Sequence, residues 1–190
     1  PFPHIYFDDV FPEELLSEIL KEFPSHKDID WQTFNDPNQI KLASSNEDDF
    51  GHVTRMFIHV LNSEPFLRFL EKLTGIKNLI SDPYLHGAGL HQILRGGLLK
   101  IHEDFSKHRL TKLDRRLNVL IYLNKDWKEE YGGFFELWDK NMEQAIVKIL
   151  PLFNRMAIFS TIPKSFHGHP DKLNCPPEMS RKSVAMYYYT

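Results

Sequence analysis

The chain has 190 residues, of which 42% are hydrophobic and 26% charged, a balance that is ordinary for one globular domain. A formal net charge of −3 gives no long-range attraction to nucleic acid or anionic lipid, and no apolar run reaches the roughly 18 residues of a membrane span, so we expect neither partner. The single cysteine excludes an internal disulfide and a cysteine-built zinc site, and it favours a reducing compartment, most simply the cytoplasm.

Three helices are predicted in the first 75 residues. The first begins at Pro12 with two acidic residues in its first turn and ends before Pro24. The second covers residues 50–62, and the third covers residues 65–74 with Gly75 as its C-terminal stop. The side chains at helical spacing, which we expect to be buried, are Leu16, Ile19, Leu20, Phe23, Val53, Met56, Phe57, Val60, Leu61, Phe66, Phe69, Leu70 and Leu73.

Between the first two helices, residues 25–49 are polar, with Trp31 and Phe34 as the large apolar anchors. We expect this segment to be irregular or to include one short strand, and the part from Trp31 to Asp49 is a candidate lid. After Gly75 the helical periodicity ends, and short β-type runs separated by Gly, Pro and Asn follow. These runs are Asn78–Ser81, Leu90–Leu94, Leu98–Glu103, Arg116–Leu123, Gly133–Trp138, Ile146–Ile149, Met156–Thr161, Ser165–His169 and Ser183–Tyr189.

Helices followed by many short strands predict a single α+β domain over residues 1–190. Its helical part covers about residues 1–75 and its strand-rich core about residues 76–190. The strands predict a sandwich, a jelly roll or a barrel, with the helices packed on one outer face.

The tripeptide His102-Glu103-Asp104 lies near the end of one predicted strand. In an extended chain, residues two apart share a face, so His102 and Asp104 point the same way and Glu103 points the other way. An imidazole beside a carboxylate is two thirds of the facial triad that binds non-haem Fe(II) and leaves coordination positions open. A solvated loop of mixed charge has the same composition, so the tripeptide alone fits either interpretation.

A third ligand is offered by His167 and His169, which share one strand parity. Gly168 beside His167 leaves room for close approach of backbone or ligand. His169 precedes Pro170, where a strand ends. We therefore favour His167 as the ligand and expect His169 at the surface.

Two further strands carry polar groups on one face. Arg181 and Ser183 share a face of the last strand, and Asn118 and Tyr122 share a face of the strand over residues 116–123. A buried arginine needs an anionic partner, and its planar fork suits a carboxylate. The pattern favours a lined cavity, although Tyr122 by itself fits equally well as a core tyrosine with a satisfied hydroxyl.

In chain order these pieces resemble the Fe(II)/2-oxoglutarate-dependent dioxygenases, in particular the prolyl 4-hydroxylase-like branch, over about residues 75–190. The pieces that carry the resemblance are His102-x-Asp104, Leu117-Asn118, Tyr122-Leu123-Asn124, Gly132-Gly133, Glu136-Leu137-Trp138, Phe159-Ser160, His167-Gly168 and Arg181-x-Ser183. The chain departs from the family pattern in two places. Leu99 stands where prolyl hydroxylases often have a tyrosine, and Arg181 follows His167 later than is usual, with residues 174–178 as a loop insertion.

The resemblance implies a double-stranded β-helix, with the N-terminal helices packed on one sheet. It implies Fe(II) on His102, Asp104 and His167, with these residues acting in catalysis through the bound iron. It further implies 2-oxoglutarate as cosubstrate together with O2. The residues that it assigns to 2-oxoglutarate are Arg181, Tyr122, Ser183 and Asn118.

The same resemblance implies hydroxylation of an unactivated C–H bond with release of succinate and CO2. The substrate by analogy is a prolyl residue in a peptide or protein. The alternatives are a free amino acid or another small metabolite, and, from a different class, a non-catalytic jelly-roll module that keeps a metal site. A basic segment from Phe105 to Asp114 directly follows the first two ligands, and it is either a lid over the substrate or a solvated loop.

Overall fold

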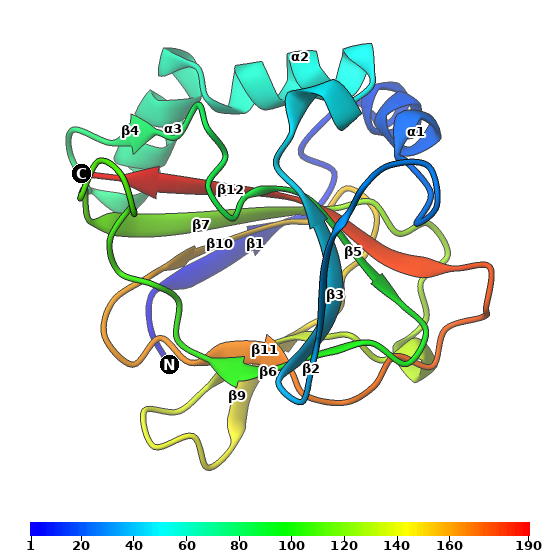
Figure 1. Cartoon of the computed structure of the whole chain (residues 1–190). Helices are drawn as coiled ribbons and strands as arrows, with labels where there is room; N and C mark the ends of the chain where they lie inside the picture. Colours follow the sequence, from blue (N-terminus) through cyan, green and yellow to red (C-terminus); the bar gives the residue numbers. More distant parts are fainter.

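The computed structural model describes residues 1–190 as one curled antiparallel sheet of twelve strands with three helices on one side (Figure 1). The helices are α1 (Glu13–Glu22), α2 (His52–Leu61) and α3 (Glu64–Thr74), with two short 3-10 turns, η1 (Glu47–Asp49) and η2 (Glu129–Tyr131). The strands are β1 (His4–Phe7), β2 (Gln32–Asp36), β3 (Gln39–Ser44), β4 (Ile80–Ser81), β5 (Gly89–Leu94), β6 (Leu98–His102), β7 (Arg115–Tyr122), β8 (Phe135–Trp138), β9 (Ala145–Ile149), β10 (Met156–Ser160), β11 (His167–His169) and β12 (Ser180–Tyr189).

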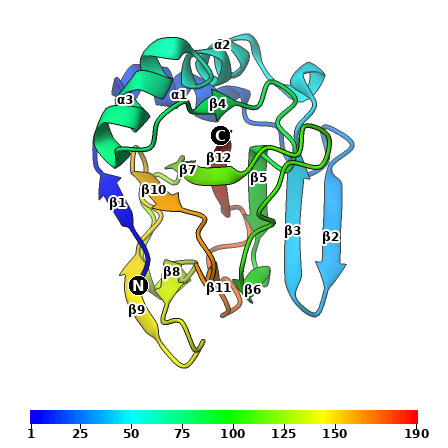
Figure 2. The same ribbon diagram turned by 90° about the vertical axis from the view of Figure 1, so that its left-hand side faces the viewer.

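The sheet folds over into two halves that face each other (Figure 2). One half has the strand order β1-β10-β7-β12-β5, and the other has the order β6-β11-β8-β9. Strand β3 joins them, because it pairs with β5 through residues 42–44 and with β6 through residues 39–40. The predicted jelly roll, with helices packed on one sheet, is therefore confirmed. None of the helices is long and apolar enough to cross a membrane.

The main core lies between the helices and the outer face of the first half. It is a cluster of 25 buried residues, to which β12 contributes Val184, Met186 and Tyr188. The hydroxyl of Tyr188 donates a hydrogen bond to the carbonyl of Leu61 at the end of α2, 2.9 Å away. A smaller cluster of 7 buried residues, including Phe135 and Phe159, occupies the space between the two halves. Phe135 and Phe159 also line a cavity inside the β-helix.

Three side chains that we expected to be buried are exposed. Met56 and Val60 are each 53% exposed, and Phe69 is 39% exposed. Helix α2 packs through a single stripe that includes Phe57 and Leu61, so Met56 and Val60 turn toward solvent. On α3 the buried residue is Leu70, and the adjacent Phe69 turns outward. Spacing alone does not fix where a short helix places the edge of its buried stripe.

The N-terminal third contains more β structure than its sequence predicts. The segment of residues 25–49 contains a complete hairpin of β2 and β3 rather than one short strand, and β1 was not predicted. Strand β2 is almost entirely exposed and β1 has no buried residue, so neither shows the alternation that marks a half-buried strand.

Glu22, at the end of α1, caps the start of α2. Its carboxylate accepts hydrogen bonds from the backbone amides of Val53 and Thr54 at 3.0 and 2.8 Å, and from the hydroxyl of Thr54 at 2.9 Å. The residue before α2 is Gly51, which has no side chain to do this. Burial raises the pKa of Glu22, but these hydrogen bonds outweigh it and lower the pKa below its usual value.

We predict that Glu22→Ala lowers the free energy of unfolding by about 1–2 kcal/mol at pH 7, since it removes the cap of α2. Because the pKa of Glu22 is lower in the folded protein, the charge-dependent stabilisation is present above the unfolded pKa and is lost as pH falls through the folded pKa. Urea unfolding at neutral and acid pH should show the gap to wild type narrowing in acid. Glu18→Ala, an exposed site on the same helix, is the control, and an equal loss there would contradict the capping role.

Candidate functional site

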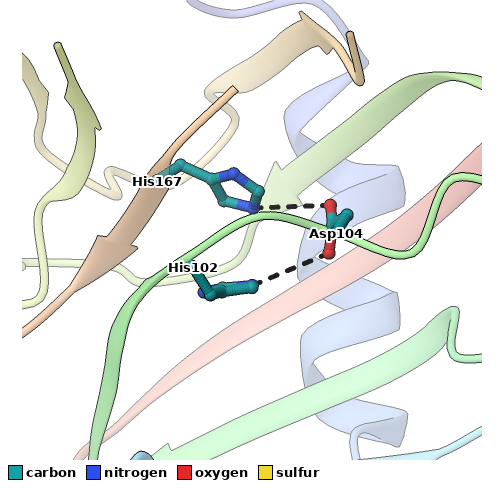
Figure 3. A group of neighbouring side chains, drawn as sticks. All are labelled: His102, Asp104 and His167. Carbon is teal, nitrogen blue, oxygen red and sulfur yellow. Dashed lines mark ion pairs between the residues drawn. The ribbon is translucent and has the colours of Figure 1, made fainter. Parts of the chain in front are cut away.

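Three side chains converge between the two halves of the sheet: His102, Asp104 and His167 (Figure 3). His102 ends β6 and lies directly opposite His167 on the neighbouring strand β11. Asp104 follows β6 in a loop and approaches both rings. Its Oδ1 is 3.6 Å from Nε2 of His102, and its Oδ2 is 3.4 Å from Nε2 of His167. All three ligand atoms lie within 4.8 Å of one another, so the structure brings together the triad that the sequence predicts.

Each imidazole is held by a hydrogen bond to the backbone carbonyl of the residue two positions before it. The Nδ1–H of His102 donates to the carbonyl of Lys100, and that of His167 donates to the carbonyl of Ser165, each at 2.8 Å. A carbonyl oxygen only accepts, so Nδ1 of each ring carries a proton, and Nε2 is the ring nitrogen that is directed to the common centre as the possible metal ligand. Burial lowers the pKa of His167 to about 4, which keeps this ring neutral at pH 7.

Asp104 is fixed by two further polar side chains. Its Oδ2 accepts a hydrogen bond of 2.6 Å from the amide of Asn118 and lies 3.1 Å from Nη2 of Arg115. The Nε–H of Arg115 donates to the amide oxygen of Asn118 at 2.8 Å. Burial alone would raise the pKa of Asp104, but the charge of Arg115 and the contact with His102 hold it well below its usual range. The carboxylate is therefore ionised and oriented, and two imidazoles with one carboxylate are a donor set that suits Fe(II).

Arg115 is a functional residue that sequence reasoning missed. Its guanidinium is buried between the rings of Phe105 and Tyr187, with its central carbon 4.4 and 3.4 Å from their centroids. Regular alternation along β7 would put Arg115 on the opposite face from Asn118. A register shift opposite Tyr188 and Tyr189 inserts one extra residue and turns Arg115 inward. The paired arginines at positions 115 and 116 were the only signal in the sequence.

Arg181 is a buried cation without an acidic partner. It is 7% exposed on the inner face of β12. Its Nε–H donates to the carbonyl of Gly133 at 2.8 Å, and its Nη2 donates to the hydroxyl of Tyr122 at 3.3 Å. An unpaired buried charge is costly, so an anionic ligand group fits beside it. The structure brings Arg181 and Tyr122 together, and their role in holding 2-oxoglutarate stays a prediction.

A narrow cavity of about 70 Å³ connects the triad with Arg181. Ser183 lies in its wall as predicted, beside Arg181 on β12. Asn118 also lines it, although its amide is engaged by Asp104 and Arg115. Additional wall residues that the sequence did not single out are Lys41, His91, Ile93 and Leu120. Leu99, which stands where prolyl hydroxylases often have a tyrosine, also lies in this wall.

His169 corrects one of our expectations, because it is not at the surface. It is 3% exposed, lines the cavity, and neither ring nitrogen has a hydrogen-bond partner. Strand β11 continues through His169, which pairs opposite Leu99 of β6, so both histidines of this strand stay between the sheets. Burial and the charge of Arg181 hold the pKa of His169 well below its usual value, so the ring is neutral at pH 7.

The segment that follows Asp104 is anchored at its base. His108 is buried, and its Nε2–H donates to the carboxylate of Asp82 at 3.2 Å, while its Nδ1 accepts from the amides of Leu110 and Thr111. Leu110 is nevertheless 69% exposed. The segment from Phe105 to Asp114, predicted as a lid or a solvated loop, thus has a fixed base at His108 and an exposed apolar tip at Leu110.

Comparisons with known proteins agree with this geometry. Residues 88–189 match the family model of the 2OG-Fe(II) oxygenase superfamily. A prolyl 3,4-dihydroxylase, OGFOD1 of Ostreococcus tauri, is 28% identical over 190 residues, which cover 88% of this chain and 34% of the relative. A prolyl 3-hydroxylase, OGFOD1 of Mus musculus, is 29% identical over 193 residues, covering 100% of this chain and 33% of the relative. The chain therefore spans about a third of the length of these relatives.

The fold is also shared with solved structures. A prolyl-4-hydroxylase of Pseudomonas putida superposes with a TM-score of 0.66 at 11% sequence identity, covering 98% of this chain and 91% of that one. At this identity the likeness concerns the fold, which is the double-stranded β-helix that the strand order shows.

We predict that Asn118→Ala weakens Mn²⁺ binding by about 10- to 100-fold, because Asp104 and Arg115 both lose the amide that orients them. Calorimetric titration of the metal-free protein measures this. Glu103→Ala is the control, since its carboxylate points away and accepts from the amide of Lys164 at 3.1 Å. Equal losses in the two variants would show that Asn118 has no specific role in orienting the ligand.

Proposed function

The chain is a member of the 2OG-Fe(II) oxygenase superfamily, and we propose that it hydroxylates a prolyl residue of a peptide or protein. In this proposal Fe(II) is held by His102, Asp104 and His167. The cosubstrate 2-oxoglutarate is held at its remote carboxylate by Arg181 and Tyr122, with Ser183 in the adjoining wall.

One observation carries the proposal: the triad and a buried, unpaired arginine share one cavity. A metal-binding module kept only for stability would need the triad but not Arg181, whose burial without an acid costs free energy. A dicarboxylate that reaches from the metal to Arg181 removes that cost. The second acidic group of 2-oxoglutarate is what distinguishes it from a simple metal chelator.

The residues of this chain position the reactants rather than transfer protons. The two rings are fixed by the carbonyls of Lys100 and Ser165, and Asp104 is fixed by Asn118 and Arg115. When Fe(II) and 2-oxoglutarate are bound, the centre supplies oxidation of a C–H bond to an alcohol by O2, coupled to conversion of 2-oxoglutarate to succinate and CO2. Asn118 does not need to contact the cosubstrate, since its amide serves Asp104.

A prolyl substrate is supported by the names of the two curated relatives, both prolyl hydroxylases. A physical feature agrees with it. Phe105 directly follows Asp104, is 42% exposed, and packs against the ring of Tyr187 in the cavity wall, so an exposed aromatic ring lies close to the cavity. A flat apolar surface of this kind suits a pyrrolidine ring, whereas a charged free amino acid gains little from it.

We predict that the Fe(II)-loaded protein releases succinate from 2-oxoglutarate in the presence of O2, and that proline-containing peptides stimulate this release. His102→Ala and Asp104→Ala should each abolish it, because two ligands alone hold the metal poorly. Mass spectrometry should show one added oxygen atom on a prolyl residue of a stimulating peptide. Stimulation by free amino acids and by no peptide would contradict the prolyl assignment, and full activity of both variants would contradict the enzyme class.

We further predict that Gly133→Ala weakens 2-oxoglutarate binding more than metal binding. A Cβ at Gly133 would lie 3.0 Å from Cδ of Arg181 and 2.6 Å from Leu173, and the φ of +70° is also strained for alanine. The guanidinium must therefore shift. Gly132→Ala has a similar φ of +71° but open space around it, so it is a control for backbone strain, and calorimetry on both variants separates the two effects.

A further inference from the structure

The unpartnered ring of His169 is the feature that the proposed function does not yet use. Both of its nitrogens are buried, and neither has a hydrogen-bond partner. Buried polar groups of native proteins are nearly always satisfied, so a ring that lacks both partners needs an explanation. His91, in the same cavity, is different, because its Nε2–H donates to the carbonyl of Gly87 at 3.1 Å.

The position of His169 is set by tight packing of β11 against β6. A Cβ at the preceding Gly168 would lie 2.7 Å from the carbonyl oxygens of Leu99 and Lys100, so the two strands lie unusually close. His169 therefore enters the cavity from the half of the sheet that contains β6 and β11. Arg181 and Ser183 enter it from the other half, on β12.

The donors of Arg181 are already partly used. Its Nε–H is taken by Gly133 and one Nη2 hydrogen by Tyr122. A carboxylate offers about four lone-pair sites. The N–H groups of Arg181 that are not used by Gly133 and Tyr122 cannot fill all of them. The imidazole on the facing wall has a ring N–H to donate. The one neighbouring acceptor of the protein, the backbone of Asp171, is not within hydrogen-bond geometry of either ring nitrogen.

We propose that His169 donates a ring N–H to the remote carboxylate of 2-oxoglutarate, which is thereby held between Arg181 on one half of the sheet and His169 on the other. This inference rests on the proposed function and adds a residue that binds the cosubstrate from the second wall. Hydrogen bonds to a charged group are stronger than those between neutral groups, so the contact contributes measurably to affinity.

The test compares two ligands on the Mn²⁺-loaded protein without O2. One is 2-oxoglutarate, and the other is 2-oxopentanoate, which has the same chelating end but a methyl group in place of the remote carboxylate. We expect His169→Val to weaken 2-oxoglutarate binding by about 10- to 100-fold and to leave the Kd of 2-oxopentanoate unchanged. Calorimetry gives both constants, together with the affinity for Mn²⁺, which should not change.

Two variants complete the comparison. His169→Gln keeps an N–H donor, and it should recover part of the lost affinity for 2-oxoglutarate. His91→Val makes the same change in the same cavity at a ring whose N–H is already used, so it should shift the two ligands by the same factor. Equal weakening of both ligands in His169→Val would mean that the ring only shapes the cavity, and would overturn the proposal.

A measurement on the wild-type protein covers the case in which His169→Val does not fold. With 15N-labelled histidine and Zn²⁺ in place of iron, 2-oxoglutarate should slow the solvent exchange of one ring N–H, and 2-oxopentanoate should not. The signal is assigned by its loss in His169→Gln. No protected ring N–H with 2-oxoglutarate bound would overturn the inference alone, whereas failure of the wild-type protein to bind 2-oxoglutarate would overturn the proposed function itself.

Discussion

The pairing of β6 with β11 is the constraint on which the site depends. It sets His102 directly opposite His167, although the two lie 65 positions apart in the chain. Each ring is then oriented by the carbonyl two residues before it, which is Lys100 within β6 and Ser165 just before β11. Asp104 has no such backbone support, and it relies on side chains from the facing half of the sheet. The candidate metal centre therefore exists only when the two halves are folded over each other.

The two faces of strands β12 and β7 have different roles: the outer faces build the hydrophobic core, and the inner faces build the site. Their outer faces contribute apolar side chains to the large core under the helices. Their inner faces carry Arg181, Ser183, Asn118 and Tyr122, which are buried polar groups that cost free energy until a ligand or a neighbour satisfies them. Burial of apolar side chains on the outer face thus offsets the free-energy cost of the unsatisfied polar groups on the inner face. The helices contribute to function in this indirect way, since none of them lines the cavity.

The sequence was informative wherever alternation or capping rules apply. The three helices, the Gly75 stop, most later strands, the triad and the inward direction of Arg181 could all be predicted from residue types and spacing. The sequence was uninformative where the pairing of strands, rather than the alternation of residue types, decides the structure. Strands β1 and β2 are exposed and show no alternation, Arg115 faces inward only because of a register shift, and His169 is buried only because β11 continues to the residue before Pro170. Such features depend on which strand lies alongside, and a single sequence does not state that.

The register shift between β7 and β12 determines which of two adjacent arginines lies beside Asp104. The residue inserted by the shift is Arg116, whose guanidinium now donates to the hydroxyl of Thr190. If β7 paired without the shift, Arg116 would occupy the inward position opposite Tyr189, and Arg115 would turn outward. One guanidinium would replace the other beside Asp104. Because the two arginines are adjacent, loss of the shift at this end of β7 would exchange the cation beside Asp104 without removing it.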